Sequence, residues 1–163
     1  MKVLWAPWRL SYVEKPGTHP DCFFCDAPLL KDPADRREAL VLHTNEHASV
    51  IMNRFPYTNG NLMVSPRQHG ADFTGIDAGL AAAVLDELRL AVRVLEKAYS
   101  PHGLNIGMNL GRAGGAGVDK HMHWHVVPRW EGDTNFMPLI AETRVVPQHI
   151  EETYDRLLPL FEE

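Results

Sequence analysis

Three histidines alternate with apolar residues in one short stretch of the chain, and imidazole can bind a metal ion, move a proton or act as a nucleophile near neutral pH. The histidines are His121, His123 and His125, and the residues between and after them are Met122, Trp124 and Val126. This alternation has the period of a β-strand, whose successive side chains point to opposite faces of a sheet. The apolar side chains are therefore expected in a core, and the histidines in a row on the other face.

A single metal ion bound by all three histidines is one interpretation of this row. Neighbouring side chains on one face of a strand lie about 6.6 Å apart, whereas zinc needs each ligand nitrogen within about 2.1 Å. Two of the imidazoles could converge on one ion, but all three could do so only with distortion. Different functions for the three histidines are therefore favoured.

Other stretches accompany this alternation, and together they resemble a known family. They are residues 4–9 (LWAPWR), 22–25 (CFFC) and 130–136 (WEGDTNF), with Pro128 and Arg129 directly after the alternation. With them, residues 121–127 resemble the histidine triad motif. Essentially the whole chain is similar to the bacterial branch of this superfamily related to diadenosine tetraphosphate phosphorylases and Fhit-type hydrolases.

The resemblance implies a chemical role for two of the histidines. In this family the middle histidine, here His123, attacks the α-phosphorus of a nucleotide and forms a nucleotidyl-histidine intermediate. Neutral imidazole suits this role because its unperturbed pKa is about 6.5. Water or phosphate then displaces the histidine, so that two easier displacements replace one difficult one. His125 is expected to hydrogen-bond phosphate oxygens or the bridging oxygen of the leaving group.

A glycine-rich segment, residues 111–117, comes shortly before the histidines. Glycine allows the backbone to approach a ligand closely, and successive N–H groups can surround phosphate oxygens. A hairpin connection would have a similar composition, but the position favours phosphate binding, with Gly115 and Gly117 as candidate contacts. Many relatives have a Gln-Ser or Gln-Thr pair where this chain has Gly117 and Val118, which makes a Hint-like phosphoramidase a weaker prediction.

Three asparagines lie where relatives contact the nucleotide. They are Asn53, Asn61 and Asn109, and each could equally be a turn or loop residue. The side chains of Leu42 and Ile51 could border an adenine, although core packing would explain them equally well.

Cys22 and Cys25 form a C-x-x-C pair, which is compatible with half of a zinc site, a redox pair or coincidence. The resemblance adds two histidines, because relatives with structural zinc place one after a sheet strand and another at the start of the triad. The corresponding residues here are His69 and His121. Two thiolates and two imidazoles make a closed tetrahedral site, which is typical of structural zinc. His43 or His47 is the alternative to His69.

The composition limits the classes of protein to consider. The chain has 163 residues, 45% of them hydrophobic, and a formal net charge of −5. This is the balance of one globular domain. The negative charge does not favour nucleic-acid binding, and the apolar runs are too short to span a membrane. The N-terminus has no signal-peptide pattern, so a cytoplasmic location is expected.

Strands and one long helix are expected to position these groups. The pattern predicts strands over residues 39–43, 48–53, 61–65, 104–110 and 121–128. It also predicts a helix that begins at Thr74 or Asp77 and ends near Tyr99, and a C-terminal helix over 150–161 that is broken near Pro159. Strands without regular βαβ alternation indicate an α+β fold with an antiparallel sheet, as the histidine triad resemblance also implies. We expect one domain over residues 1–163, with an N-terminal arm (1–20) and a C-terminal helical segment (147–163).

Together these features predict a nucleotide hydrolase or transferase that acts on the α-phosphate of dinucleoside polyphosphates, with a structural zinc ion. The resemblance also implies a homodimer. The sequence is also compatible with three other functions. They are a Hint-like phosphoramidase or other nucleotidyl transferase, a nucleotide-sensing protein with little turnover, and a metal-dependent hydrolase that uses His123 and His125 as ligands.

Overall fold

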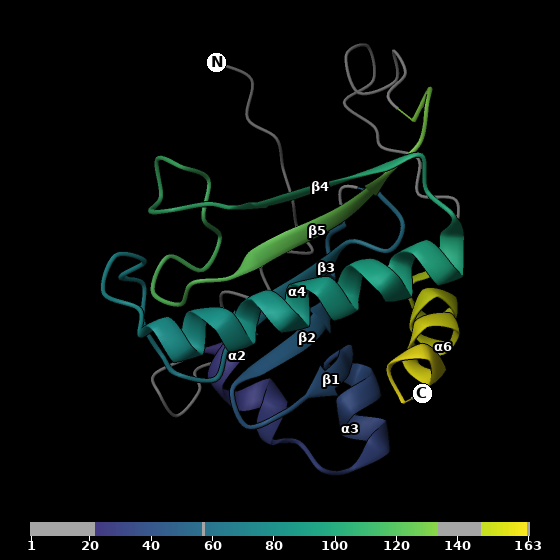
Figure 1. Ribbon diagram of the computed structural model, residues 1–163. Helices are drawn as coiled ribbons and strands as arrows, with labels where there is room; N and C mark the ends of the chain where they lie inside the picture. The colour runs from purple at the N-terminus through teal and green to yellow at the C-terminus, as the bar shows by residue number, and fades with distance from the viewer. Residues whose placement is uncertain (1–21, 57, 134–147, 163) are drawn as a thin grey trace, which may run out of the picture.

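The computed structural model describes residues 22–56, 58–133 and 148–162. The expected N-terminal arm (1–20) lies outside the described residues. Five strands form one sheet in the order β1-β2-β3-β5-β4, and every neighbouring pair is antiparallel (Figure 1). The strands are β1 (Val41–Thr44), β2 (Ala48–Met52), β3 (Leu62–Pro66), β4 (Gly103–Met108) and β5 (Trp124–Arg129). The α+β prediction is confirmed.

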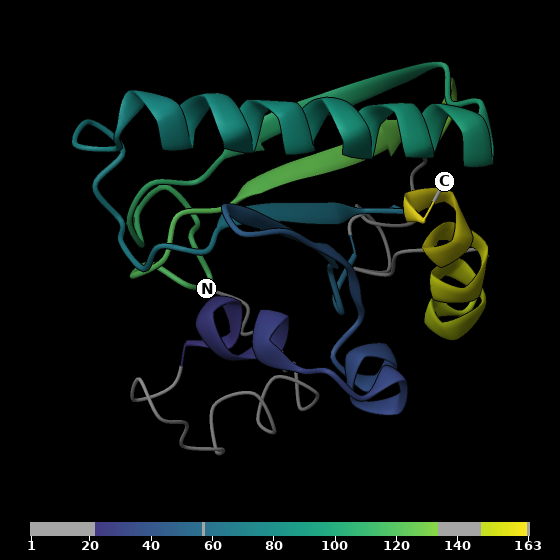
Figure 2. The same cartoon turned by 60° about the horizontal axis from the view of Figure 1, so that its bottom comes forward.

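The long helix α4 (Ala78–Tyr99) lies across one face of the sheet (Figures 1 and 2). The helix begins after Asp77, whose side chain accepts hydrogen bonds from the backbone N–H groups of Gly79 and Leu80. Such a cap satisfies N–H groups that have no partner within the helix. The described core is formed by the apolar side of α4 and strand residues such as Val64 and Val126. The predicted helix is therefore confirmed, with Asp77 as its cap.

Three short helical segments precede the sheet: α2 (Phe23–Asp26), the 3₁₀ helix η2 (Ala27–Leu29) and α3 (Pro33–Glu38). The helix α6 (Ile150–Phe161) follows the sheet. In Figure 2, α2 and α3 lie on the opposite side of the sheet from α4. The helix α6 packs against α4 and β1. None of the helices among the described residues is long and apolar enough to cross a membrane.

The strand ends differ from the sequence-based prediction by up to three residues, and one strand and one helix differ for an identifiable reason. The strand β5 begins at Trp124 rather than at residue 121, because its pairing with β3 and β4 ends at Trp124 and the N–H of Met122 instead donates to the carbonyl of Gly70. The helix α6 continues through Pro159. Pro159 is exposed and stands in the last turn, so few helical hydrogen bonds follow it.

Candidate functional site

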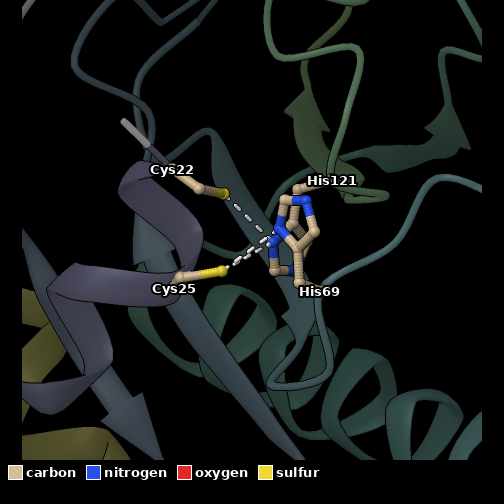
Figure 3. Close-up of side chains that lie close together, drawn as sticks. All are labelled: Cys22, Cys25, His69 and His121. Carbon is tan, nitrogen blue, oxygen red and sulfur yellow. Dashed lines mark hydrogen bonds between the residues drawn. The ribbon is translucent and has the colours of Figure 1, made fainter. Parts of the chain in front are cut away.

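Four side chains from distant parts of the sequence meet at one end of the sheet (Figure 3). They are Cys22, Cys25, His69 and His121, and one ligand atom from each lies within 4.8 Å of all the others. The Sγ of Cys22 lies 3.2 Å from Nδ1 of His121, and the Sγ of Cys25 lies 3.3 Å from Nδ1 of His69. The structure thus brings together the four residues that the sequence had suggested as ligands.

The separations in this cluster fit a tetrahedral zinc ion. Ordinary zinc–sulfur and zinc–nitrogen bond lengths place sulfur and nitrogen ligands about 3.6 Å apart, and Cys25 Sγ lies 3.5 Å from His121 Nδ1. His121 also has the required tautomer, because its Nε2–H donates to the carbonyl of Pro66 at 2.8 Å and leaves Nδ1 with a lone pair. A hydrogen bond from the ring nitrogen that does not face the metal is usual for a histidine that binds a metal ion.

The thiol of Cys25 would carry little negative charge without a cation. Burial, followed by the neighbouring Cys22, raises the pKa of the Cys25 thiol to about 11. Burial is also the main cause of the lowered pKa of His121. Neutral imidazoles and thiols that lose their protons to a metal ion are the donor set of a structural zinc site.

The two alternative histidines lie elsewhere. Nε2 of His43 is 3.8 Å from a carboxylate oxygen of Glu87 on α4, and Nε2 of His47 is 2.9 Å from a carboxylate oxygen of Glu46. Neither belongs to the four-residue cluster. Among the three candidates, His69 is therefore the one that the fold places beside the cysteines.

His123 is buried next to this cluster. Its Nδ1–H donates to the backbone carbonyl of His121 at 2.9 Å, so the lone pair of the neutral ring is on Nε2. Burial lowers the pKa of His123, which keeps the imidazole neutral at neutral pH. The ring of Phe24 stacks on the imidazole, with centroids 4.6 Å apart. An imidazole in this state can attack an electrophile through Nε2.

His125 lies next to His123, with ring centroids 5.2 Å apart and nearly perpendicular planes. Burial, followed by the charge of His123, lowers the pKa of His125. The residue pairs with Met63 on β3 and with Gly107 on β4. A side chain at Gly107 would meet no atom within 4 Å, so open space borders His125 on that side. Sequence reasoning missed Gly107, although a glycine inside a strand can mark a close approach by a ligand.

The glycine-rich segment forms turns between β4 and β5. The φ angles of Gly111 and Gly115 are +69° and +89°, which favour glycine. The side-chain amide of Asn109 donates to the carbonyl of Gly115, and Arg112 pairs with Asp119 at 2.9 Å. Asn109 thus holds the loop in place, and its predicted contact with phosphate stays a prediction, as do the contacts of Gly115 and Gly117.

Asn53 and Asn61 border a cavity of about 260 Å³ between the β2–β3 loop and the start of α6. Asn61 is buried, and its amide makes no hydrogen bond within the described structure. A buried amide without a partner is costly and can be satisfied by water or a ligand. The three histidines are not among the described residues that line this cavity. Leu42 and Ile51, the suggested borders of an adenine site, belong to the core.

Comparison with known proteins identifies the family of this chain. Residues 35–132 match the HIT domain. The chain belongs to the HIT domain family. It is 34% identical to the AP-4-A phosphorylase of Mycobacterium tuberculosis, over 94% of this chain and 80% of that protein.

Solved HIT-family structures have the same fold. A zinc-bound histidine triad family protein from Mycobacterium smegmatis has a TM-score of 0.67 and 27% identity, covering 86% of this chain and 93% of that one. A hypothetical histidine triad nucleotide-binding protein from Sulfolobus tokodaii has a TM-score of 0.64 and 22% identity, covering 86% and 89%. The resemblance inferred from the motif is therefore confirmed at the level of family and fold.

Proposed function

We propose that this HIT-family chain is an enzyme that cleaves dinucleoside polyphosphates such as diadenosine tetraphosphate at the α-phosphate. The observation that carries the proposal is the state of His123, a buried neutral imidazole whose Nδ1–H is held by the carbonyl of His121. Its similarity to an AP-4-A phosphorylase over 94% of the chain supports the choice of substrate class.

In the proposed first step, Nε2 of His123 forms a bond to the α-phosphorus and the bond to the bridging oxygen breaks. The products are a nucleotidyl-His123 and the remaining nucleoside polyphosphate. His125, next to His123, donates a hydrogen bond to the phosphate oxygens or the departing oxygen. In the second step, an oxygen of phosphate or water attacks the same phosphorus and the bond to Nε2 breaks. The enzyme returns to its starting state.

We further propose that Cys22, Cys25, His69 and His121 hold one structural zinc ion. Their distances and donor types support this assignment, as does similarity to a zinc-bound family member. All four ligands come from the protein, so the site is closed and the ion supplies stability rather than a reactive water. A reducing, cytoplasmic location would keep both thiols available to the metal.

A homodimer is the proposed assembly. In the described sheet β4 is the last strand, and its sequence GLNIGM contains neither charge nor proline, two features that normally protect a sheet edge. The side chains of Ile106 on β4 and Leu85 on α4 are 51% and 57% exposed. They border one groove together with Leu88, Val92 and two arginines, Arg89 and Arg93. A second copy could extend the sheet at β4 and cover the apolar part of this groove.

The proposed activity is tested by incubating the protein with diadenosine tetraphosphate, with and without inorganic phosphate, and separating the adenine nucleotides. With phosphate as acceptor, ATP and ADP form together and turnover depends on phosphate. With water as acceptor, ATP and AMP form in either buffer. If the protein binds the dinucleotide but all of it is recovered intact, the chain is a binding protein and the proposed function is wrong.

A further inference from the structure

The C-x-x-C turn contributes an aromatic ring to the candidate nucleophile as well as two thiols to the metal cluster. Phe24 stands between Cys22 and Cys25 in a tight turn, in which the N–H groups of Cys25 and Asp26 donate to the carbonyl of Cys22. The Phe24 ring stacks on the imidazole of His123 with a centroid distance of 4.6 Å and an interplanar angle of 26°. Only 1% of Phe24 is exposed, so the contact lies within the protein.

Stacking matters here because rotation of the imidazole about χ2 is only weakly restricted by the side chain itself. The χ2 torsion of histidine is broad and roughly two-fold, so the ring can turn or flip unless its surroundings prevent it. The hydrogen bond from Nδ1 to the carbonyl of His121 fixes one edge of the ring. It does not by itself fix the ring plane. The flat contact with Phe24 restricts that plane, and His125 lies against the ring at a steep angle.

We propose that Phe24 is a positioning residue for His123, and that the C-x-x-C turn therefore sets the orientation of the nucleophile. One support of the imidazole comes from a residue of the metal cluster and the other from the turn that carries its cysteines. Phe24 lies between the two cysteines, and the carbonyl that accepts the hydrogen bond belongs to His121. The cluster and the nucleophile thus form one connected unit. This inference rests on the proposed role of His123.

Phe24→Leu and Phe24→Met test the proposal, the second because methionine keeps most of the volume of the ring. Phe23→Leu is the matched control, since Phe23 lies in the same turn and meets Phe24 edge-on. Three quantities are measured on each protein as purified. They are the zinc content, the values of kcat and KM with diadenosine tetraphosphate, and the tautomer of His123 from the ¹⁵N NMR shifts of its ring.

We expect both Phe24 variants to retain the metal, to lose about tenfold or more in kcat with KM nearly unchanged, and to show a mixture of His123 tautomers. Phe23→Leu should match the wild type in all three measurements. Unchanged kcat and an unchanged tautomer in both Phe24 variants would overturn the proposal. Loss of metal from both would also overturn it, because Phe24 would then serve the cluster rather than His123.

The NMR measurement separates this proposal from the proposed activity. The tautomer of His123 is read without substrate, so it reports on Phe24 even if wild-type protein does not cleave diadenosine tetraphosphate. Absence of turnover together with a Phe24-dependent tautomer would contradict the proposed substrate and leave the positioning role supported.

Discussion

At the scale of single residues, the site divides the three histidines between two tasks. His121 turns its Nδ1 toward the two cysteines, whereas His123 uses its Nδ1–H to hold the carbonyl of His121. This division explains how three neighbouring imidazoles can be useful without sharing one metal ion. Among the described residues, the group of possible metal ligands does not include His123 or His125, which argues against a hydrolase that uses them as ligands.

Replacing one cluster thiol gives a residue-scale prediction. Cys22→Ser should lower the zinc content from about one per chain and reduce the melting temperature by about 10 °C or more, because a structural zinc ion contributes of order 10 kcal/mol to folding in small metal sites. His47→Ala, which changes an exposed histidine outside the cluster, is the control. Elemental analysis and thermal unfolding measure the two effects. Metal-free wild-type protein with two reactive thiols and the same melting temperature as the variant would contradict the zinc assignment.

The pH dependence of zinc affinity follows from the same thiols. Because the pKa of Cys25 is raised to about 11, its thiol is protonated at neutral pH and must release a proton when zinc binds. Zinc affinity should therefore rise steadily from pH 6 to pH 8, and the zinc-dependent part of the stability should fall as the pH falls. Competition with a chromophoric chelator at several pH values measures the affinity. A constant affinity over this range would show that the thiol does not bind the ion.

At the scale of elements, a buried carboxyl group joins α4 to the β1–β2 turn. Oε1 of Glu87 accepts a hydrogen bond from the side-chain amide of Asn45 at 2.6 Å, and the other oxygen lies 3.8 Å from Nε2 of His43. Glu87 stands among apolar residues on the buried side of the helix. Burial raises its pKa, and the neighbouring His43 opposes that shift only in part. Helical periodicity alone would not have placed a glutamate here.

Glu87→Gln gives the element-scale prediction. A raised pKa means that the folded state binds the proton more tightly than the unfolded state, so Glu87 favours folding less as the pH rises above its ordinary range near 4.5. The stability of Glu87→Gln relative to wild type should therefore increase between pH 5 and pH 8. Urea unfolding at both pH values measures it. Asp86→Asn, at an exposed neighbouring position, is the control, and an equal change in that variant would refute the explanation.

At the scale of the whole molecule, the exposed edge of β4 predicts association between two copies. Ile106→Arg would add a positive charge beside Arg89 and Arg93 in the groove and should weaken the dimer at least about tenfold, since a buried unpaired charge is costly. Leu29→Arg is the control, because Leu29 is 61% exposed and lies on η2, outside the groove. Sedimentation velocity at micromolar concentration distinguishes the species. A wild-type protein that is monomeric at these concentrations would contradict the proposed assembly.

Much of the fold and of the candidate site could be predicted from the sequence, because the strands, the helix cap and the metal cluster are indicated by short local patterns or by motifs. The alternation at residues 121–127 predicted a strand, and the sequence indicated Thr74 or Asp77 as the cap of α4, of which Asp77 is the cap. The C-x-x-C pair, together with the two histidines that the family resemblance implies, predicted the four-residue cluster. The start of β5 could not be predicted, since it depends on where pairing with β3 and β4 ends. The stack of Phe24 on His123 joins two segments that lie far apart in the sequence, so no local pattern indicates it.

The most direct test of the central claim is detection of the nucleotidyl group on His123. Wild-type protein is mixed with diadenosine tetraphosphate without added phosphate, quenched in alkali, where a bond between phosphorus and nitrogen survives, and digested for mass spectrometry. We expect an adenylyl group on the peptide that contains His123, and none on His123→Ala, which should still bind the nucleotide. An adduct on another residue, or rapid turnover by His123→Ala, would contradict it.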